Sequence, residues 1–240
     1  MIKLEKKESI YFLTMDADEN RWNTTFVREI ADALDAIEND DGPGALITSS
    51  TNQKFYSNGL DLEWMQAPEK HPDGGDREVF GEEFMYLMGR FITLPIPTIC
   101  AINGHAFGAG FMFALSHDVR IMREDRGFIC ANEMQLGLPI PRPELALFKH
   151  KIPANSFFET VQLSKRWTGS NALKAGIIQG VCSYEELPKV TLKKAEELAP
   201  LANNRKNFGL QKEMLYGENA AINLNHGPAH MLKNSKDFEI

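Results

Sequence analysis

The chain has 240 residues, of which 43% are hydrophobic and 25% are charged, values typical of one large globular α/β domain with an ample core. Its formal net charge of −7 argues against a nucleic-acid partner. No run approaches the roughly 18 apolar residues of a membrane span, we expect no signal peptide, and three cysteines without a C-x-x-C pair fit a reducing compartment, which we take to be the cytoplasm.

The first half of the chain alternates between strand-like and helix-like segments. Residues 24–40 and 76–93 repeat apolar side chains at a helical period, whereas residues 68–78 are polar and rich in turn formers, which predicts a loop. Short apolar runs predict strands at residues 9–16, 44–50, 97–103 and 119–124. This order predicts a mostly parallel sheet with helices outside it.

From about Asn155 the pattern becomes helical. Four further helices are predicted within residues 156–165, 170–176, 190–202 and 205–217. A soft boundary between the two halves lies near Pro153, and neither an internal repeat nor a low-complexity segment is found.

Two corners of small residues follow strand-like runs, at SNGLDL (57–62) and GHAFGAGFMFAL (104–115). Gly59 permits a turn that points the N–H of Leu60 outwards. A helix predicted to begin around Gly108 leaves the N–H groups of its first turn, which includes Ala109, without internal partners. If both N–H groups meet at one oxygen atom they form an oxyanion hole. The simpler interpretation is two tight turns with close helix packing.

A third stretch, NEMQLGLPIP (132–141), places Glu133 after an apolar run. A carboxylate in apolar surroundings has a raised pKa, which suits proton transfer near neutral pH. Taken alone, Glu133 is more simply interpreted as a surface glutamate at a strand end.

Together, FYSNGLDL, PTICAINGHAFGAGFMFALSHDVRIM, NEMQLGLPIP and WTGSNALKAGIIQGVC resemble the crotonase, or enoyl-CoA hydratase/isomerase, superfamily from about residue 2 to residue 182. The resemblance implies an α/β fold with a ββα spiral core over residues 1–182. It also implies a carboxyl-terminal helical trimerisation region over residues 183–240, hence a homotrimer or hexamer. The implied ligand is an acyl-CoA thioester, with coenzyme A as part of the substrate and no separate cofactor.

The resemblance also assigns roles to residues. It implies that the N–H groups of Leu60 and Ala109 hold the thioester oxygen and that Glu133 is the catalytic base. The residues implied to bind substrate are Ser57, Asn58, Gly59, Asp61, Gly108 and Asn132.

One departure from the hydratases of this superfamily bears on the reaction. Hydratases use two glutamates, and Met112 stands where the first is expected, while Glu133 aligns with the second. NEMQLG also resembles Δ3,Δ2-enoyl-CoA isomerases, the plant-type members in particular. The implied reaction moves the double bond of a 3-enoyl-CoA with Glu133 as the single proton shuttle, which takes a proton from C2 and returns it to C4, giving trans-2-enoyl-CoA in fatty acid β-oxidation. The alternatives are another crotonase-type hydratase, lyase, hydrolase or racemase, and a non-catalytic acyl-CoA-binding relative.

Other residues with reactive side chains have ordinary explanations. His105, His117 and Asp118 are interpreted as structural, and Cys100 and Cys130 as buried small side chains. Glu144 follows Pro143, which favours an ordinary helix start, although a second carboxylate facing the pocket is the alternative. No histidine pair is interpreted as having metal-ligand spacing, so we predict no metal site.

Overall fold

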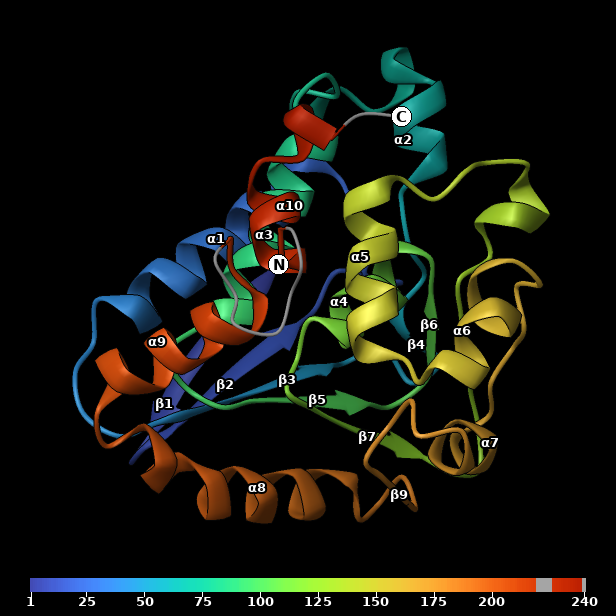
Figure 1. Ribbon diagram of the computed structural model, residues 1–240. Coiled ribbons are helices and arrows are strands. Elements are labelled where there is room, and N and C mark those ends of the chain that lie inside the picture. The colour runs from blue at the N-terminus through green and yellow to red at the C-terminus, as the bar shows by residue number, and fades with distance from the viewer. Residues whose placement is uncertain (219–225, 239–240) are drawn as a thin grey trace.

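The computed structural model describes residues 1–218 and 226–238 of the chain. Its larger sheet is mostly parallel, as predicted, with only its first pair of strands antiparallel (Figure 1). In spatial order its strands are β1 (Ile2–Lys7), β2 (Ile10–Met15), β3 (Ala45–Ser50), β5 (Thr98–Ile102), β7 (Val119–Arg123) and β9 (Gly180–Cys182).

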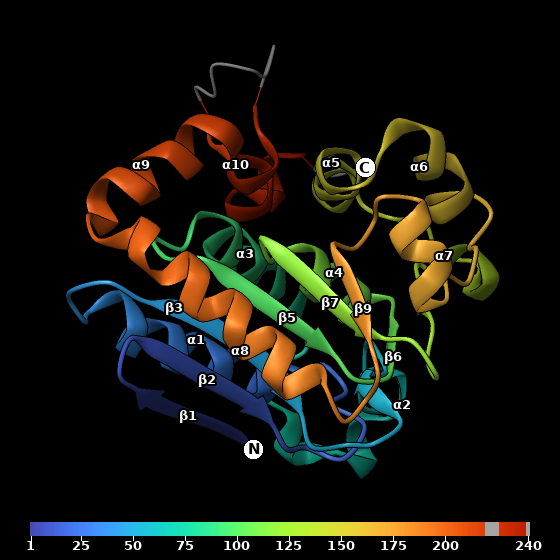
Figure 2. The ribbon, with the colours of Figure 1, turned by 90° about the horizontal axis from the view of Figure 1, so that it is seen from below.

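Helices cover both faces of this sheet. On one face lie α1 (Thr24–Glu38), α3 (Phe80–Thr93) and α4 (Ala109–Leu115), and on the other lies α8 (Leu187–Leu198), which crosses the strands in Figure 2. Side chains alternate accordingly along the strands. In β3, Ile47 packs in the cluster beneath α8 whereas Leu46 belongs to the main core. The sheet is therefore buried on both faces, which explains its near-continuous apolar strands.

The sequence accounts directly for α1. The side chain of Asn23 caps the helix by accepting a hydrogen bond from the N–H of Phe26 at 2.9 Å. The apolar positions Val27, Ile30 and Leu34 recur at helical spacing and are all buried against the core. A good cap and one apolar face are sufficient to fix this helix.

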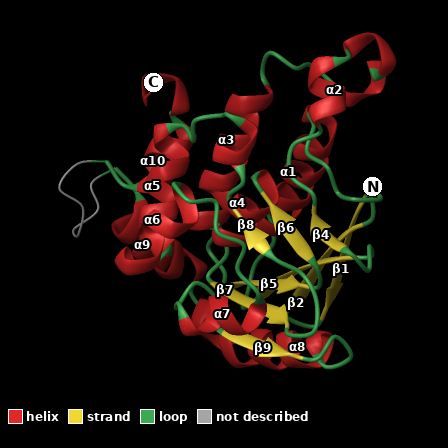
Figure 3. Cartoon of the chain, turned by 90° about the vertical axis from the view of Figure 1, so that its right-hand side faces the viewer, coloured by secondary structure: helices red, strands yellow, loops and turns green. Residues whose placement is uncertain are grey.

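A second, smaller sheet was not predicted. Its three short strands, β4 (Phe55–Ser57), β6 (His105–Phe107) and β8 (Ile129–Cys130), are all parallel. Figure 3 shows them side by side, next to α4. Because parallel strands end at the same edge, the three segments that follow them are brought together there.

The remaining elements are mostly helical. α9 (Arg205–Tyr216) and α10 (Pro228–Lys233) pack against α3. The contact between α10 and α3 is close at Gly89, where an added Cβ would lie 2.7 Å from the Lys233 side chain. These elements are α2 (Leu62–Gln66), η1 (Pro68–Lys70), η2 (Pro72–Gly74), η3 (Glu133–Leu136), α5 (Arg142–Lys151), α6 (Ala154–Val161), α7 (Gly169–Lys174), η4 (Ala199–Ala202), α9 (Arg205–Tyr216), α10 (Pro228–Lys233) and η5 (Ser235–Phe238).

One predicted helix boundary was wrong. The helix expected from Asp76 begins only at Phe80. The Asp76 side chain instead accepts a hydrogen bond from the N–H of Glu78, and Arg77 donates to the carbonyls of Trp64 and His71. These local bonds hold the segment as a turn, in competition with a helix.

The division between a core of residues 1–182 and a helical region of residues 183–240 stays a prediction. Within the described residues, no helix combines the length and the apolar character that crossing a bilayer requires.

Candidate active site

The carboxyl ends of the three short strands open onto a cavity of about 360 Å³. Seven of the nine residues proposed from the sequence as catalytic or substrate-binding line it: Asn58, Gly59, Leu60, Gly108, Ala109, Asn132 and Glu133. Residues from three separated motifs thus share one wall. The parallel pairing of β4, β6 and β8 is what brings them together.

The first corner frees one N–H group. Gly59 has a φ of 80°, which glycine tolerates and other residues rarely adopt. Its carbonyl accepts a hydrogen bond from the N–H of Trp22, and the N–H of Asp61 donates to the Trp22 carbonyl. The N–H of Leu60, between these two bonds, has no acceptor among the described residues.

The second corner frees another. Gly108 has a φ of 48°, and its carbonyl accepts the hydrogen bonds of Phe111 and Met112 at the start of α4. The N–H of Ala109, the first residue of that helix, has no acceptor within the described chain. Both unpaired donors belong to residues that line the cavity.

The two corners touch one another. A Cβ placed on Gly59 would lie 2.8 Å from the carbonyl oxygen of Phe107 and 3.8 Å from the nitrogen of Ala109. Any side chain at position 59 would therefore press on Phe107, the residue before Gly108 in the second corner. Both positive φ and close approach require glycine here, so the corners are more than independent tight turns.

Glu133 is the first residue of η3 and lies beside the second corner. Its Oε1 would be 3.1 Å from a Cβ on Gly108, and its Oε2 is buried without a hydrogen-bond partner among the described residues. Burial raises the pKa of the Glu133 carboxyl, and its own backbone N–H opposes part of that rise. A carboxylate so poorly solvated is a stronger base than one in water.

Glu144 is a second carboxyl on the cavity wall, although the sequence favoured an ordinary helix start for it. Burial raises its pKa to about 8, with a further contribution from the charge of Glu133. At neutral pH the carboxyl of Glu144 is therefore mostly protonated.

The rest of the wall is largely apolar and was missed by the sequence analysis. Phe80 and Phe84 belong to the core and also line the cavity. The other residues not anticipated are Arg21, Leu62, Leu136, Leu138, Pro139 and Pro141. Several come from loops and short turns, whose residues carry no periodic signal.

Two residues proposed to bind substrate lie elsewhere. Ser57 is fully buried, where its hydroxyl donates to the Asn20 carbonyl at 2.7 Å and accepts from the indole N–H of Trp22. Asp61 caps α2 by accepting from the N–H of Trp64 at 3.0 Å. Neither side chain lines the cavity that holds Glu133.

His105, His117 and Met112 are surrounded by structural contacts. His117 is fully buried between Thr48 and the Phe113 carbonyl, and His105 accepts from the N–H of Phe128. Met112 is buried in α4 and does not line the cavity.

Away from the cavity wall, Glu218, His226 and His230 have potential ligand atoms within 4.8 Å of one another. The sequence analysis overlooked the i, i+4 spacing of these two histidines. The first two residues of the cluster are exposed, and exposed groups of this kind often carry no ion.

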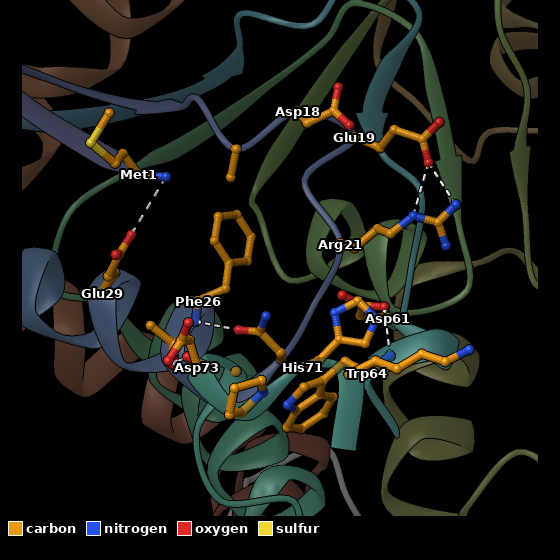
Figure 4. Close-up of a pocket in the computed structure, with 16 residues that line it drawn as sticks. Met1, Asp18, Glu19, Arg21, Phe26, Glu29, Asp61, Trp64, His71 and Asp73 are labelled. Carbon is orange, nitrogen blue, oxygen red and sulfur yellow. Dashed lines mark hydrogen bonds and ion pairs between the residues drawn. The ribbon is translucent and has the colours of Figure 1, made fainter. Parts of the chain in front are cut away.

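A second, larger cavity of about 460 Å³ adjoins the first, and Arg21 lines both. Figure 4 shows the Arg21 side chain paired with Glu19, and Asp61 at the start of α2. Five carboxyl side chains line this cavity against the side-chain cations Arg21 and Lys70 and the imidazole of His71. An acidic lining disfavours phosphate groups, so this cavity is a poor site for the charged end of a coenzyme A ester.

Comparison with known proteins agrees with this geometry. Residues 5–222 match the protein family described as enoyl-CoA hydratase/isomerase. The chain is 32% identical to enoyl-CoA delta isomerase 3 of Arabidopsis thaliana over 222 residues, which covers 91% of this chain and 93% of that protein. It is 31% identical to the peroxisomal enoyl-CoA delta isomerase 2 of the same plant over 227 residues, covering 92% and 95%.

A solved structure gives the same result for the fold. A Mycobacterium tuberculosis protein, described as an enoyl-CoA isomerase in one structure and as a probable enoyl-CoA hydratase in another, superposes in the first with a TM-score of 0.77 at 25% identity, covering 88% of this chain and 89% of that one. The fold and family predicted from the four motifs are thereby confirmed. The chain belongs to the enoyl-CoA hydratase/isomerase family, the crotonase superfamily of acyl-CoA enzymes.

Proposed function

We propose that the protein moves the double bond of a 3-enoyl-CoA to give the trans-2-enoyl-CoA. The observation that carries this proposal is one cavity wall that combines two unpaired N–H groups, of Leu60 and Ala109, with the buried carboxyl of Glu133. Such a wall can hold an enolate oxygen while a base removes a proton from the adjacent carbon atom.

The reaction begins with the thioester oxygen between the two N–H groups. The Glu133 carboxylate removes a proton from C2, the C3–C4 double bond becomes conjugated in a dienolate, and negative charge develops on the held oxygen. Each N–H donor contributes about 2.7–4 kcal/mol to such a charged transition state. A proton then returns at C4, which leaves the double bond between C2 and C3.

Two observations favour isomerisation over hydration. Met112 stands where a hydratase base is expected, and its side chain is buried away from the cavity. The plant relatives that match most of the chain are named enoyl-CoA delta isomerases. Without a base for water at that position, the double bond can move but water is not readily added.

The rest of the wall suits an acyl chain. Leu62, Phe80, Phe84, Leu136 and Leu138 give the cavity apolar surface beside Glu133. Coenzyme A enters as part of the substrate, so no resident cofactor is invoked.

The direct test is an assay of the purified protein on 3-hexenoyl-CoA and, separately, on 2-hexenoyl-CoA in water. The first substrate should be converted to the conjugated ester, detected by its absorbance, and the second should be hydrated very slowly. Failure to convert 3-hexenoyl-CoA would refute the proposal.

A hydratase or dehydratase is the second candidate, because the Glu144 carboxyl on the same wall could serve as the second acid of that reaction. In that case 2-hexenoyl-CoA would be hydrated at a rate that rivals isomerisation.

A further inference from the structure

Glu144 reaches the cavity because of its place on α5. Leu147 and Phe148, three and four residues later, are buried on the same face of that helix. Phe148 packs edge-on against Phe111 of α4, with ring centroids 5.6 Å apart. The packing of α5 on α4 therefore turns the face that carries Glu144 towards the helix that begins at Ala109.

Neither carboxyl on the wall is neutralised by a cation. Within residues 1–218 and 226–238, the carboxyl groups of Glu144 and Glu133 form no ion pair, and no cation contributes to the pKa shift of either. Arg21, which also lines the cavity, is paired with Glu19 at 2.6 Å. Burial, and then the charge of Glu133, raises the pKa of Glu144 to about 8, so Glu144 keeps its proton while Glu133 is ionised.

The two carboxyls also occupy different parts of the wall. Glu133 is held beside the second corner, close to Gly108, so it lies near the carbon next to a thioester bound there. Glu144 lies on α5, and the chain passes through the wall residues Pro139 and Pro141 before it enters that helix. A base confined near C2 leaves the delivery of a proton at C4 to a second group.

We propose that Glu144 is the second catalytic residue of the isomerisation, delivering a proton to C4 while Glu133 removes one from C2. The inference rests on the proposed function. Glu133 begins as the carboxylate and ends as the acid, and Glu144 begins as the acid and ends as the carboxylate. The electron pair of the broken C2–H bond forms the new C2–C3 double bond, and the electrons of the old C3–C4 double bond form the new C4–H bond. Proton transfer from Glu133 to Glu144, directly or through water, restores both groups.

The test separates proton removal at C2 from proton delivery at C4. Glu144→Gln keeps the shape of the side chain and leaves Glu133 in place. Its isomerase turnover should fall at least roughly 10²-fold, the usual contribution of a positioned acid. It should still exchange the C2 protons of 3-hexenoyl-CoA with D₂O, measured by mass spectrometry of the recovered substrate. Glu133→Gln should lose both exchange and isomerisation.

Two controls complete the design. Glu159→Gln changes a residue of α6 that forms an exposed ion pair with Lys165, and this variant should keep normal turnover. The melting temperature of each variant reports folding. A single turnover of 3-hexenoyl-CoA deuterated at C2, with enzyme in excess, should give a product without deuterium at C4.

The possible outcomes are distinguishable. Deuterium at C4, or near-normal isomerisation by a folded Glu144→Gln, would overturn the role of Glu144 and leave the single-base reaction standing. If Glu133→Gln is also active, or the native protein does not isomerise 3-hexenoyl-CoA, the proposed function itself fails.

Discussion

At the scale of single residues, the chemistry depends on how little the surroundings of Glu133 stabilise its charge. Its Oε2 is buried without a hydrogen-bond partner among the described residues, and its Oε1 lies beside Gly108. Removing a proton from carbon needs a base that is not already satisfied by hydrogen bonds. In the proposed reaction this side chain faces an uncharged carbon atom, and it forms no ion pair with the described residues, so it should contribute little to ligand binding.

Glu133→Gln should therefore separate catalysis from binding. The amide keeps the shape of the side chain but cannot accept a proton from carbon, so turnover should fall by at least roughly 10²-fold. Binding of an acyl-CoA ester, measured by calorimetry, should change by less than about tenfold, or 1.4 kcal/mol. A large loss of affinity with normal turnover per bound substrate would show that Glu133 binds and does not catalyse.

Gly59 and Ala109 should respond in opposite ways to a change of one methyl group. Gly59→Ala places a Cβ 2.8 Å from the Phe107 carbonyl at a φ of 80°, so both corners must move and activity should fall sharply. Ala109→Gly keeps the N–H group in place and should be tolerated. Steady-state assays and thermal melts of the two variants provide the comparison, and equal activity would contradict the shared oxyanion hole.

At the scale of elements, the sequence predicted long periodic segments well and short ones poorly. The apolar repeat of α1 and its Asn23 cap are visible in the sequence, and the helix follows them. The strands of the small sheet have two or three residues each, too few to display alternation. The three motifs were nevertheless assigned to one site, because their resemblance to a known family carries the geometry that their lengths cannot.

Glu144 illustrates what sequence alone leaves open. Whether this carboxyl faces solvent or the cavity depends on which side of α5 packs against α4, and that is decided by Leu147, Phe148 and their partner Phe111. Pro143 beside it predicted only the start of the helix. The orientation of a helix about its axis is a property of tertiary packing, so the side chain could be noted as a candidate but not placed.

The burial of α4 leads to a prediction about Met112. Its side chain is about 1% exposed and packs in the core, so Met112→Glu would place a carboxylate among apolar groups without a partner. We expect destabilisation of several kcal/mol and no gain in hydration of 2-hexenoyl-CoA. Denaturant unfolding and the hydratase assay measure the two effects. A stable variant with new hydratase activity would mean that α4 can turn this position towards the cavity.

At the scale of the whole molecule, a buried ion pair joins the carboxyl-terminal helices to the core. Lys212 of α9 donates to Asp118 at 2.7 Å and to the carbonyl of Ile96 at 3.1 Å, and its side chain is 6% exposed. Asp118 in turn accepts from the N–H of Thr98, the first residue of β5. The pair thus connects α9 to the centre of the larger sheet.

Lys212→Met should lower the free energy of unfolding by roughly 3–5 kcal/mol, because the buried Asp118 carboxylate loses its ion-pair partner. The double variant with Asp118→Asn should recover part of this loss, since the uncompensated charge is gone. Urea unfolding of both proteins measures the difference. An unchanged stability in the single variant would show that the pair is open to water.

Assembly into a trimer or hexamer is a further prediction at this scale. Five apolar side chains are exposed on η3, α6 and the residues next to them, with Phe158 at 61%. Contact between Gln162 and Met134 shows that the two segments adjoin. The members are Met134, Leu136, Leu138, Phe158 and Leu163.

Phe158→Glu should shift the protein towards monomers, because a charge would enter an apolar contact. Light scattering after size-exclusion chromatography gives the mass, and Tyr86→Glu, at an exposed aromatic residue of α3 outside the predicted trimerisation region, is the matched control. A native protein that elutes as a monomer would contradict the expected assembly.

The two edges of the larger sheet limit how copies of the chain can associate. β1 offers unpaired backbone groups along its outer side, yet it carries Lys3, Glu5, Lys6 and Lys7 and is largely exposed. β9, at the other edge, has only three residues. A charged border on one side and a very short one on the other discourage a neighbouring chain from continuing the sheet, the first step towards fibrous aggregates. Crowding this protein to high concentration should therefore favour closed assemblies joined through helices over open-ended stacks of strands.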